Sequence, residues 1–353
     1  MDRLVEPLGL LHGRAAAAAL AADLALPLAG GPTAFTLVRL IGAGAPERPL
    51  ALADVPAEWQ PAVMEVTRAP AAFAGLPAGR PLMMGILNVT PDSFSDGGRH
   101  GDHGAAVMAG HAMLEAGADL LDIGGESTRP GATPVPPEEE CRRVLPVIRE
   151  LAKAATISVD TRNAATMLAA LDAGAEIVND VSALRHDAAA ARVLARSEAS
   201  VILMHMLGDD PRTMQRDPRY SDVAAEVAAF LAERIAWTER QGIARARIAV
   251  DPGIGFGKQA HHNLDLMDRL PLLAGLGCAV VFGASRKRFL GELTGVAAAE
   301  ERVIGSVTAA LAAAARGATI LRVHDVAETL AALAVWDAVS RGGATDQDAA
   351  ADA

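Results

Sequence analysis

The chain has 353 residues, of which 51% are hydrophobic, so it is long enough to bury a large core. Its formal net charge is −11 and its basic residues form no long run, which argues against binding to nucleic acid or to an anionic membrane surface. The two cysteines, Cys141 and Cys278, lie in no zinc-binding or redox motif and favour a reducing cytoplasm.

The first 79 residues carry no motif that points to chemistry. An Ala-rich stretch at 15–31 is broken by an acidic residue and a proline and is too short to span a bilayer, so it predicts a helix packed on protein. We expect a helix near 14–25 and a strand at 35–40. We interpret residues 1–79 as a small appended subdomain that covers one end or edge of the main domain, with a regulatory or partner-binding role as the alternative.

From residue 80 onward one unit repeats: an apolar strand, a polar residue at its end, a loop and a helix. Its first copy, Met83–Gly98, begins with an apolar run without alternation, which is typical of a strand buried on both faces of a parallel sheet. The expected strands are Leu82–Leu87, Leu120–Ile123, Thr156–Val159, Glu176–Val178, Val201–Met204, Arg247–Val250, Ala279–Phe282 and Thr319–Val323. The clearest expected helices are Pro137–Ala152, Ala164–Ala173, Ser221–Gln241, Glu300–Ala315 and Val326–Ser340.

The polar residues at the strand ends are Asn88, Asp122, Asp160, Asn179 with Asp180, His205, Asp251, Ser285 and His324. Eight such units match a (β/α)8 TIM barrel, an α/β fold of about 250 residues whose active site lies at the carboxyl ends of its strands. We therefore predict a barrel over residues 80–341 in which these side chains form one ring, preceded by the extension at 1–79. The small, polar tail at 342–353 is expected to be flexible.

The connection after the second strand is long for such a barrel. It reads ESTRPGATPVPP, contains four prolines and Arg129, and exceeds the usual length of about 2–6 residues. A lid over the active site and a stiff surface loop are both compatible with this sequence. We favour the lid because the first connection is also long and polar.

Three strand ends offer carboxylates and an amide. Asp160 could cap the helix that follows it, or accept two N–H bonds from a heterocycle. Asn179 is expected to face the ring, and Asp180 to begin a helix. Asp251 precedes a proline, which places a carboxylate on a rigid turn, whereas the glycines between it and Lys258 lack the spacing of a phosphate-binding P-loop.

Positive charge gathers near the end of the barrel. Residues 285–288 read SRKR, and Arg322 and His324 share one side of the last strand because they alternate along it. An anion clamp is favoured over a solvated basic face, since the loops after the seventh and eighth strands are the usual phosphate site of this barrel. The ring thus predicts a heterocycle side, formed by Asp160, Asn179, Asp251 and Lys287, and an anion side, formed by Asn88, Ser285, Arg322 and His324.

Lysine is rare in this chain. Only Lys153, Lys258 and Lys287 occur among 32 basic residues, so arginine is the default cation. A lysine inside a glycine-rich or polar loop is therefore a candidate for a chemical requirement.

The strand-end motifs closely resemble those of the dihydropteroate synthase family. NVTPDSFSDGG, DIGGESTRPGA, SVDT, NDVSA, LMHM, DPGIGFGK, SRK and RVHD occur in the family's order. The resemblance covers about residues 80–340, leaves out the extension, and shows no departure at the site positions.

The resemblance implies a transferase of folate biosynthesis that joins 6-hydroxymethyl-7,8-dihydropterin diphosphate to 4-aminobenzoate and releases pyrophosphate. It also implies a homodimer that is a sulfonamide target. In the pterin site it implies Asp160, Asn179, Asp251 and Lys287, bordered by Phe256. For the diphosphate it implies Mg²⁺ at Asn88, with Thr128, Arg322 and His324 on the substrate or leaving group, and for the aminobenzoate Arg129 and Ser285.

Two alternatives remain open at this point. A methyltetrahydrofolate methyltransferase that acts on a corrinoid partner would share the pterin carboxylates but would not need Arg322, His324 or Arg129. A catalytically silent paralogue would bind ligand and regulate a partner, although intact loops argue against it.

Overall fold

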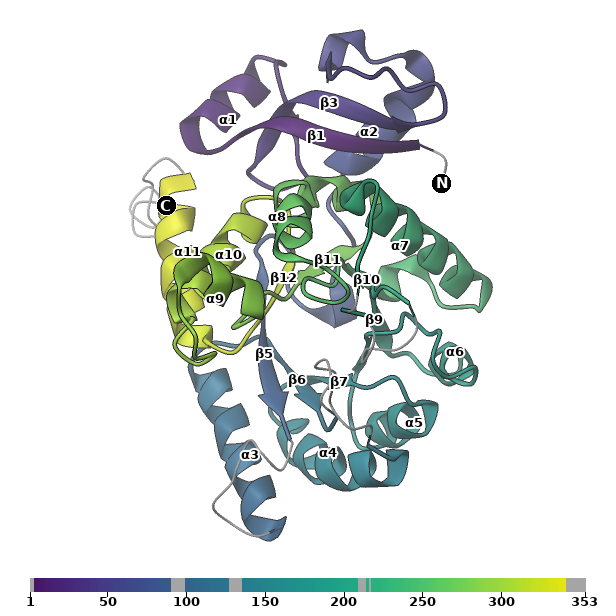
Figure 1. The fold of residues 1–353 in the computed structure, drawn as a ribbon, viewed down its shortest axis with the longest axis vertical. Helices are drawn as coiled ribbons and strands as arrows, with labels where there is room; N and C mark the ends of the chain where they lie inside the picture. Colours follow the sequence, from purple (N-terminus) through teal and green to yellow (C-terminus); the bar gives the residue numbers. More distant parts are fainter. Residues whose placement is uncertain (1–2, 90–98, 127–134, 209–213, 216, 341–353) are drawn as a thin grey trace, which may run out of the picture.

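Eight parallel strands close into a barrel in this computed structural model, which describes residues 3–89, 99–126, 135–208, 214–215 and 217–340 (Figure 1). The strands follow one another around the barrel and the last pairs with the first. They are β5 (Leu82–Asn88), β6 (Leu120–Gly124), β7 (Thr156–Asp160), β8 (Ile177–Asp180), β9 (Ser200–Met204), β10 (Ile248–Asp251), β11 (Ala279–Phe282) and β12 (Ile320–Val323). All eight lie where the sequence predicts them, so the (β/α)8 prediction is confirmed.

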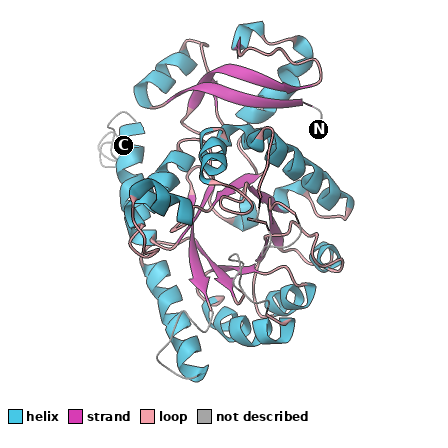
Figure 2. Ribbon diagram, in the orientation of Figure 1, coloured by secondary structure: helices cyan, strands magenta, loops and turns pink. Residues whose placement is uncertain are grey.

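Helices surround the barrel on its outer face (Figure 2). They are α3 (Arg99–Glu115), α4 (Pro137–Leu151), α5 (Ala164–Asp172), α6 (Ala190–Ala195), α7 (Val223–Arg240), α8 (Ala260–Asp268), α9 (Arg288–Thr294), α10 (Val303–Ala314) and α11 (Val326–Ser340), with the 3-10 helices η5 (Arg245–Arg247) and η6 (Leu270–Leu276). α4 begins at a proline and has three glutamates in its first turn, an arrangement that suits the positive end of the helix dipole. Among the described helices, none combines the length and apolar character needed to cross a bilayer.

Side chains alternate between the outside and the inside of each strand. On the outside, Leu121 and Ile123 of β6 pack with Val147 of α4 in the main core. On the inside, Leu120 and Ile320 belong to a separate apolar cluster at the amino ends of the strands. Two residues further along, the same inner faces carry polar side chains, so the barrel interior is apolar at its amino end and polar at its carboxyl end.

The residues before the barrel form a small antiparallel sheet with a core of its own. Its order is β1-β3-β2, and β4 also pairs with β3. The core cluster contains Phe35 and Val38 of the central strand, together with Trp59 and Val66. The elements are β1 (Arg3–Leu11), α1 (Gly13–Ala21), β2 (Leu26–Pro27), β3 (Ala34–Gly42), β4 (Leu50–Ala51), α2 (Gln60–Thr67) and the 3-10 helices η1 (Leu52–Asp54), η2 (Ala57–Trp59) and η3 (Phe73–Gly75).

The extension sheet lies over α7, α8 and η6 of the barrel (Figure 1). A charged group fixes this contact: Arg269 Nε donates to Glu6 Oε1 at 2.8 Å, and Arg269 Nη1 donates to Asp222 Oδ1 at 2.7 Å. Glu6 is only 1% exposed, so this ion pair is buried between the sheet and the barrel. The extension therefore packs against the barrel through specific contacts.

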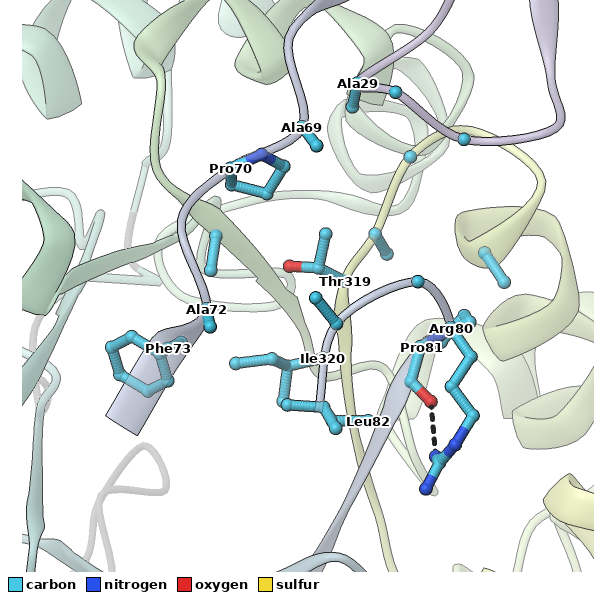
Figure 3. A pocket seen from close by; sticks show the side chains of 18 of the residues that line it. Ala29, Ala69, Pro70, Ala72, Phe73, Arg80, Pro81, Leu82, Thr319 and Ile320 are labelled. Carbon is cyan, nitrogen blue, oxygen red and sulfur yellow. Dashed lines mark hydrogen bonds between the residues drawn. The ribbon is translucent and has the colours of Figure 1, made fainter. Parts of the chain in front are cut away.

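Phe73 closes the amino end of the barrel. It is 3% exposed and belongs to the apolar cluster inside the strands, where it packs with Leu82 and Ile320. Beside it, a cavity of about 230 Å³ lies between residues 28–33, the segment 69–82 and the amino ends of β11 and β12 (Figure 3). The cavity is thus at the opposite end of the barrel from the polar side chains.

Candidate active site

The carboxyl end of the barrel gathers the polar side chains that the sequence predicts. Strand register sets Gly124 beside Asp160, Asp160 beside Asn179, and Asp251 beside Met204. The described ring consists of Asn88, Asp122, Asp160, Asn179, Asp251, Lys287 and Arg322. These residues come from separate strands, and their side chains lie together at one end of the barrel, as the sequence predicts.

Asp122 and Arg322 form the floor of this ring. Asp122 is fully buried, and its two oxygens accept three hydrogen bonds: from Arg322 Nε at 2.6 Å, Asn179 Nδ2 at 3.0 Å and Ser158 Oγ at 2.6 Å. These bonds hold the guanidinium and the amide in fixed orientations. Asp122 is a positioning group that the site prediction left out, although its place at a strand end was a signal for it.

Arg322 also reaches the neighbouring strand, where its Nη2 donates to Asp160 Oδ2 at 2.8 Å. Burial raises the pKa of Asp160 to about 7, while the positive charge of Arg322 opposes the rise and the negative charge of Asp122 adds to it. We expected Arg322 on an anion side and Asp160 on a heterocycle side. One guanidinium bridges the two sides, and the division between them stays a prediction.

Asp251 and Lys287 occupy the opposite part of the ring. Asp251 Oδ1 accepts the Gly253 N–H at 2.6 Å, and burial raises the pKa of this carboxyl while the charge of Lys287 opposes the rise. Burial lowers the pKa of Lys287 to about 8, and the charge of Asp251 limits the fall. Lys287 Nζ donates to the Ile254 carbonyl oxygen and lies 4.9 Å from the Phe256 ring centroid. A cation, a carboxylate and an aromatic ring thus meet at one place.

An apolar wall adjoins Phe256. Its buried members are Val181, Met204, Met206 and Met214. Polarizable methionines adapt to flat ligands, so this wall suits a heterocycle that the polar atoms orient. Among its members, only Phe256 was predicted as a site residue, because apolar side chains at strand ends give no distinctive sequence signal.

Ser285 and His324 connect the last two strands of the barrel. Ser285 Oγ lies 3.0 Å from His324 Nδ1, and the His324 N–H donates to Ser285 Oγ at 3.1 Å. Arg286, next to Ser285, turns away and pairs with buried Asp325, its Nε donating to Oδ2 at 3.2 Å. Arg288 pairs with Glu292 on the surface of α9. Arg286 and Arg288 are thus held by carboxylates, whereas Lys287 faces Asp251; the anion clamp formed with Ser285, Arg322 and His324 stays a prediction.

Other strand-end residues have structural roles. Asp180 accepts the N–H groups of Ser182 at 2.7 Å and Leu184 at 2.9 Å, so it stabilises a turn. The expectation that Asp180 begins a helix is wrong, because α6 starts only at Ala190. His205 is buried and contacts Lys258, with 2.9 Å between Lys258 Nζ and His205 Nδ1. Asp160 does not cap the next helix; Asp187 Oδ2 accepts the Ala164 N–H there.

Asn88 ends β5 beside Gly124, and a Cβ atom added at Gly124 would lie 3.9 Å from Asn88 Oδ1 and 3.5 Å from Asp160 Cβ. The amide oxygen therefore faces the ring. Thr128 and Arg129, two further predicted site residues, lie outside the described residues. Within the described part of the chain, no group of three or more His, Cys, Asp or Glu residues could hold a metal ion by itself.

Comparison with known proteins agrees with this geometry. A family model described as "Pterin binding enzyme" matches residues 84–324. The chain is 51% identical over 267 residues to a dihydropteroate synthase of Neisseria meningitidis serogroup B, covering 74% of this chain and 93% of the relative. It is 45% identical over 265 residues to the dihydropteroate synthase of Escherichia coli K12, with the same two coverages.

Solved structures give the same result. A Xanthomonas albilineans dihydropteroate synthase with 4-aminobenzoic acid superposes with a TM-score of 0.70 at 55% identity, covering 74% of this chain and 93% of that one. A Yersinia pestis dihydropteroate synthase in a sulfonamide drug complex has a TM-score of 0.70 at 44% identity, with coverages of 74% and 94%. With the barrel, the strand-end ring and these similarities, the chain belongs to the dihydropteroate synthases within the pterin-binding enzyme family.

Proposed function

We propose that this chain condenses 6-hydroxymethyl-7,8-dihydropterin diphosphate with 4-aminobenzoate to give 7,8-dihydropteroate and pyrophosphate. The observation that carries the proposal is the meeting of Asp160, Asp251, Lys287 and Arg322 within one ring at the carboxyl end of the barrel. The proposal also draws on a Xanthomonas albilineans relative whose structure is described as a complex with 7,8-dihydropteroate.

The pterin is assigned to the part of the ring that combines polar edges with an apolar wall. Asp251 would accept N–H bonds from the guanidine-like edge of the heterocycle, and Asn179 and Lys287 would meet its remaining polar edge. Phe256 and the methionine wall would cover a face. Bonds between charged groups and a ligand contribute about 1.5–3 kcal/mol each, so a few of them fix the orientation of a small ring.

The diphosphate and the aminobenzoate are assigned to the neighbouring groups. Arg322 belongs to the last strand and bonds to Asp160. His324 directly follows that strand, and Ser285, which follows β11, lies 3.0 Å from it. The proposed contacts are Thr128, Arg322 and His324 for the leaving group, and Arg129 and Ser285 for the aminobenzoate.

A magnesium ion is proposed beside Asn88. Mg²⁺ prefers oxygen ligands and keeps several waters, with one or two protein oxygens and phosphates completing its shell. The Asn88 amide oxygen fits this role because it lies beside Gly124, next to Asp160, at the carboxyl end of the barrel. When bound, the ion would supply charge stabilisation to the diphosphate.

The reaction needs no catalytic base in this chain. An aromatic amine is neutral near pH 7, so departure of the diphosphate from the pterin methylene is the difficult step. Arg322 would stabilise the negative charge on the leaving group, while Asp160 and Asp251 would stabilise the positive charge left on the pterin. The protein's contribution is then to orient both substrates and to exclude water.

Release of pyrophosphate tests this function directly. The purified chain is mixed with both substrates and Mg²⁺, and pyrophosphate is measured with each substrate omitted in turn. Release that requires both substrates supports the synthase. Pterin binding without release would support the silent paralogue, and methyl transfer from methyltetrahydrofolate to a corrinoid would support the methyltransferase.

A homodimer and a cytoplasmic location complete the proposal. Exposed apolar side chains on the late helices, Leu293 of α9, Ile304 of α10 and Val335 of α11, suit contact with a second copy of this chain. Cys141 and Cys278 are both unpaired, which suits a reducing compartment. Light scattering on the wild type and on Ile304→Asp tests the dimer: a monomeric wild type would contradict it.

A further inference from the structure

Lys258 has no role in the reaction described above, yet it is a lysine at the end of a glycine-rich loop and only 2% exposed. Its ammonium has three acceptors, which match its three N–H donors: His205 Nδ1 at 2.9 Å, the Phe256 carbonyl oxygen at 3.0 Å and the His205 carbonyl oxygen at 3.4 Å. Burial lowers the pKa of Lys258, and moving this buried group would leave its polar atoms and their acceptors without partners, so the geometry holds it in one place.

The three acceptors lie in the segments that follow two adjacent strands, β9 and β10. His205 directly follows β9, and its N–H donates to the Asp251 carbonyl oxygen at 3.0 Å, at the end of β10. Phe256 belongs to the loop after β10. Lys258 therefore joins the end of one strand to the loop that leaves the next.

The glycines of this loop permit a close approach to the end of β9. Gly253 and Gly257 have φ values of 68° and 66°, and a Cβ atom added at either would overlap the His205 carbonyl oxygen or the Leu207 side chain, respectively. The loop thus lies directly on residues 205–207, and Lys258 holds it there.

Four consecutive carbonyl oxygens of the loop each accept a bond from a side chain. Tyr220 Oη donates to the Gly257 carbonyl at 2.9 Å, Lys258 donates to that of Phe256, and Gln215 Nε2 donates to that of Gly255. The fourth, Ile254, accepts from Lys287. Tyr220, Lys258 and Gln215 hold the loop in place. The loop in turn orients Lys287, through the Ile254 carbonyl oxygen, and the Phe256 ring against which Lys287 lies.

We propose that Lys258, together with His205, is a positioning residue for the synthase reaction: it fixes the 253–257 loop so that Lys287 and Phe256 meet the pterin in one arrangement. The proposal rests on the proposed function, because it concerns the pterin side of that site. Lys258 itself touches no substrate.

Lys258→Met tests the proposal, since methionine fills similar space without the three bonds. We expect kcat/KM for the dihydropterin diphosphate to fall by about tenfold to a hundredfold, as for a displaced substrate-positioning group. The loss should be mainly in KM for the pterin substrate, with KM for 4-aminobenzoate changed much less. Arg247→Met is the matched control. Arg247 also donates to main-chain carbonyl oxygens, those of Leu194 and Ala199, but it lies before the amino end of β10, at the other end of that strand from the 253–257 loop.

A purely structural role predicts a different result. Lys258→Met and Arg247→Met would then lower Tm and reduce activity in proportion, with no selective rise in the pterin KM. That result, or an unchanged kcat/KM in Lys258→Met, would overturn the proposal. Calorimetry with a pterin that lacks the diphosphate measures binding independently of turnover. Weaker binding in Lys258→Met, but not in Arg247→Met, supports the positioning role. A wild type that binds the pterin but releases no pyrophosphate would count only against the proposed function.

A second pair of variants decides the question if Lys258→Met does not fold. His205→Asn keeps an acceptor close to the position of Nδ1, whereas His205→Leu removes it. Pterin affinity retained in His205→Asn and lost in His205→Leu supports the proposal. Equal affinities in the two variants would contradict it.

Discussion

Asp122 and Arg322 are joined across the interior of the barrel, with 2.6 Å between Asp122 Oδ2 and Arg322 Nε, although 200 residues separate them in the chain. Asp122 is fully buried, so without Arg322 it would be a buried charge bonded only to neutral groups, and without Asp122 the guanidinium would keep only Asp160. We expect Asp122→Asn and Arg322→Met each to lower the free energy of unfolding by about 3–5 kcal/mol, as when a buried ion pair loses one member. Urea unfolding followed by tryptophan fluorescence measures this.

The double variant should lose less than the sum of the single losses, because the second substitution removes the charge that the first left unpaired. Glu239→Gln is the control: Glu239 and Arg245 form a half-exposed pair, for which about 1 kcal/mol or less is expected. Additive losses at Asp122 and Arg322 would mean that the pair does not act as a unit.

Asp251→Asn should weaken pterin binding by about tenfold to a hundredfold, since an amide cannot accept two strong N–H bonds and one charge-assisted bond contributes about 1.5–3 kcal/mol. Isothermal calorimetry with the pterin alone gives the affinity. Asp180→Asn is the matched control, because Asp180 is also a buried carboxylate at a strand end but bonds only to its own turn. Equal losses of affinity in the two variants would reject the assigned role of Asp251.

The pH dependence of kcat/KM for the pterin substrate should be a narrow bell. Asp160, with a pKa of about 7, gains its negative charge as the pH rises, and Lys287, with a pKa of about 8, loses its positive charge as the pH rises further. If both charges are needed, activity falls on either side, since this parameter reports the free enzyme. Lys287→Arg should move the alkaline limb upward because a guanidinium stays charged. An alkaline limb that does not move in Lys287→Arg would exclude Lys287 as its source.

Arg269→Met should destabilise the protein without changing catalysis. Its loss removes the bonds to buried Glu6, which keeps only its pair with Arg39, so we expect the free energy of unfolding to fall by about 1.5–3 kcal/mol. Arg68→Met, which breaks an exposed pair with Glu65, is the control and should cost little. A change in either KM in Arg269→Met would show that the extension influences the site and would contradict a covering role alone.

The barrel could be predicted from the sequence because local patterns encode it. Mostly apolar runs mark the strands from β5 to β12, with a polar residue in or directly after each of them. β1 was missed, since Pro7 and Gly9 interrupt its pattern and its pairing with β3 depends on residues far along the chain. Pro7 is tolerated because β1 is at the edge of its sheet.

The site residues were predicted better than their partners. Strand-end position placed Asp160, Asn179 and Asp251 in the ring, but position alone could not show that Arg322 bonds to Asp122 and Asp160. The same limit applies to Arg286, whose sequence neighbours suggest an anion site and whose partner Asp325 makes it structural. Pairings between distant strands depend on the folded geometry and leave no local pattern.

Phe73 precedes β5 in the chain, so the aromatic ring that closes the barrel leaves the ribosome before any of the eight strands does. The last strand, β12, pairs with β5 and completes the wall around that ring at the end of synthesis. We therefore expect a shortened chain that begins at β5 to fold less stably than a circular permutant that begins at β5, because the permutant carries residues 73–76 after β12, where Phe73 can still enter the barrel.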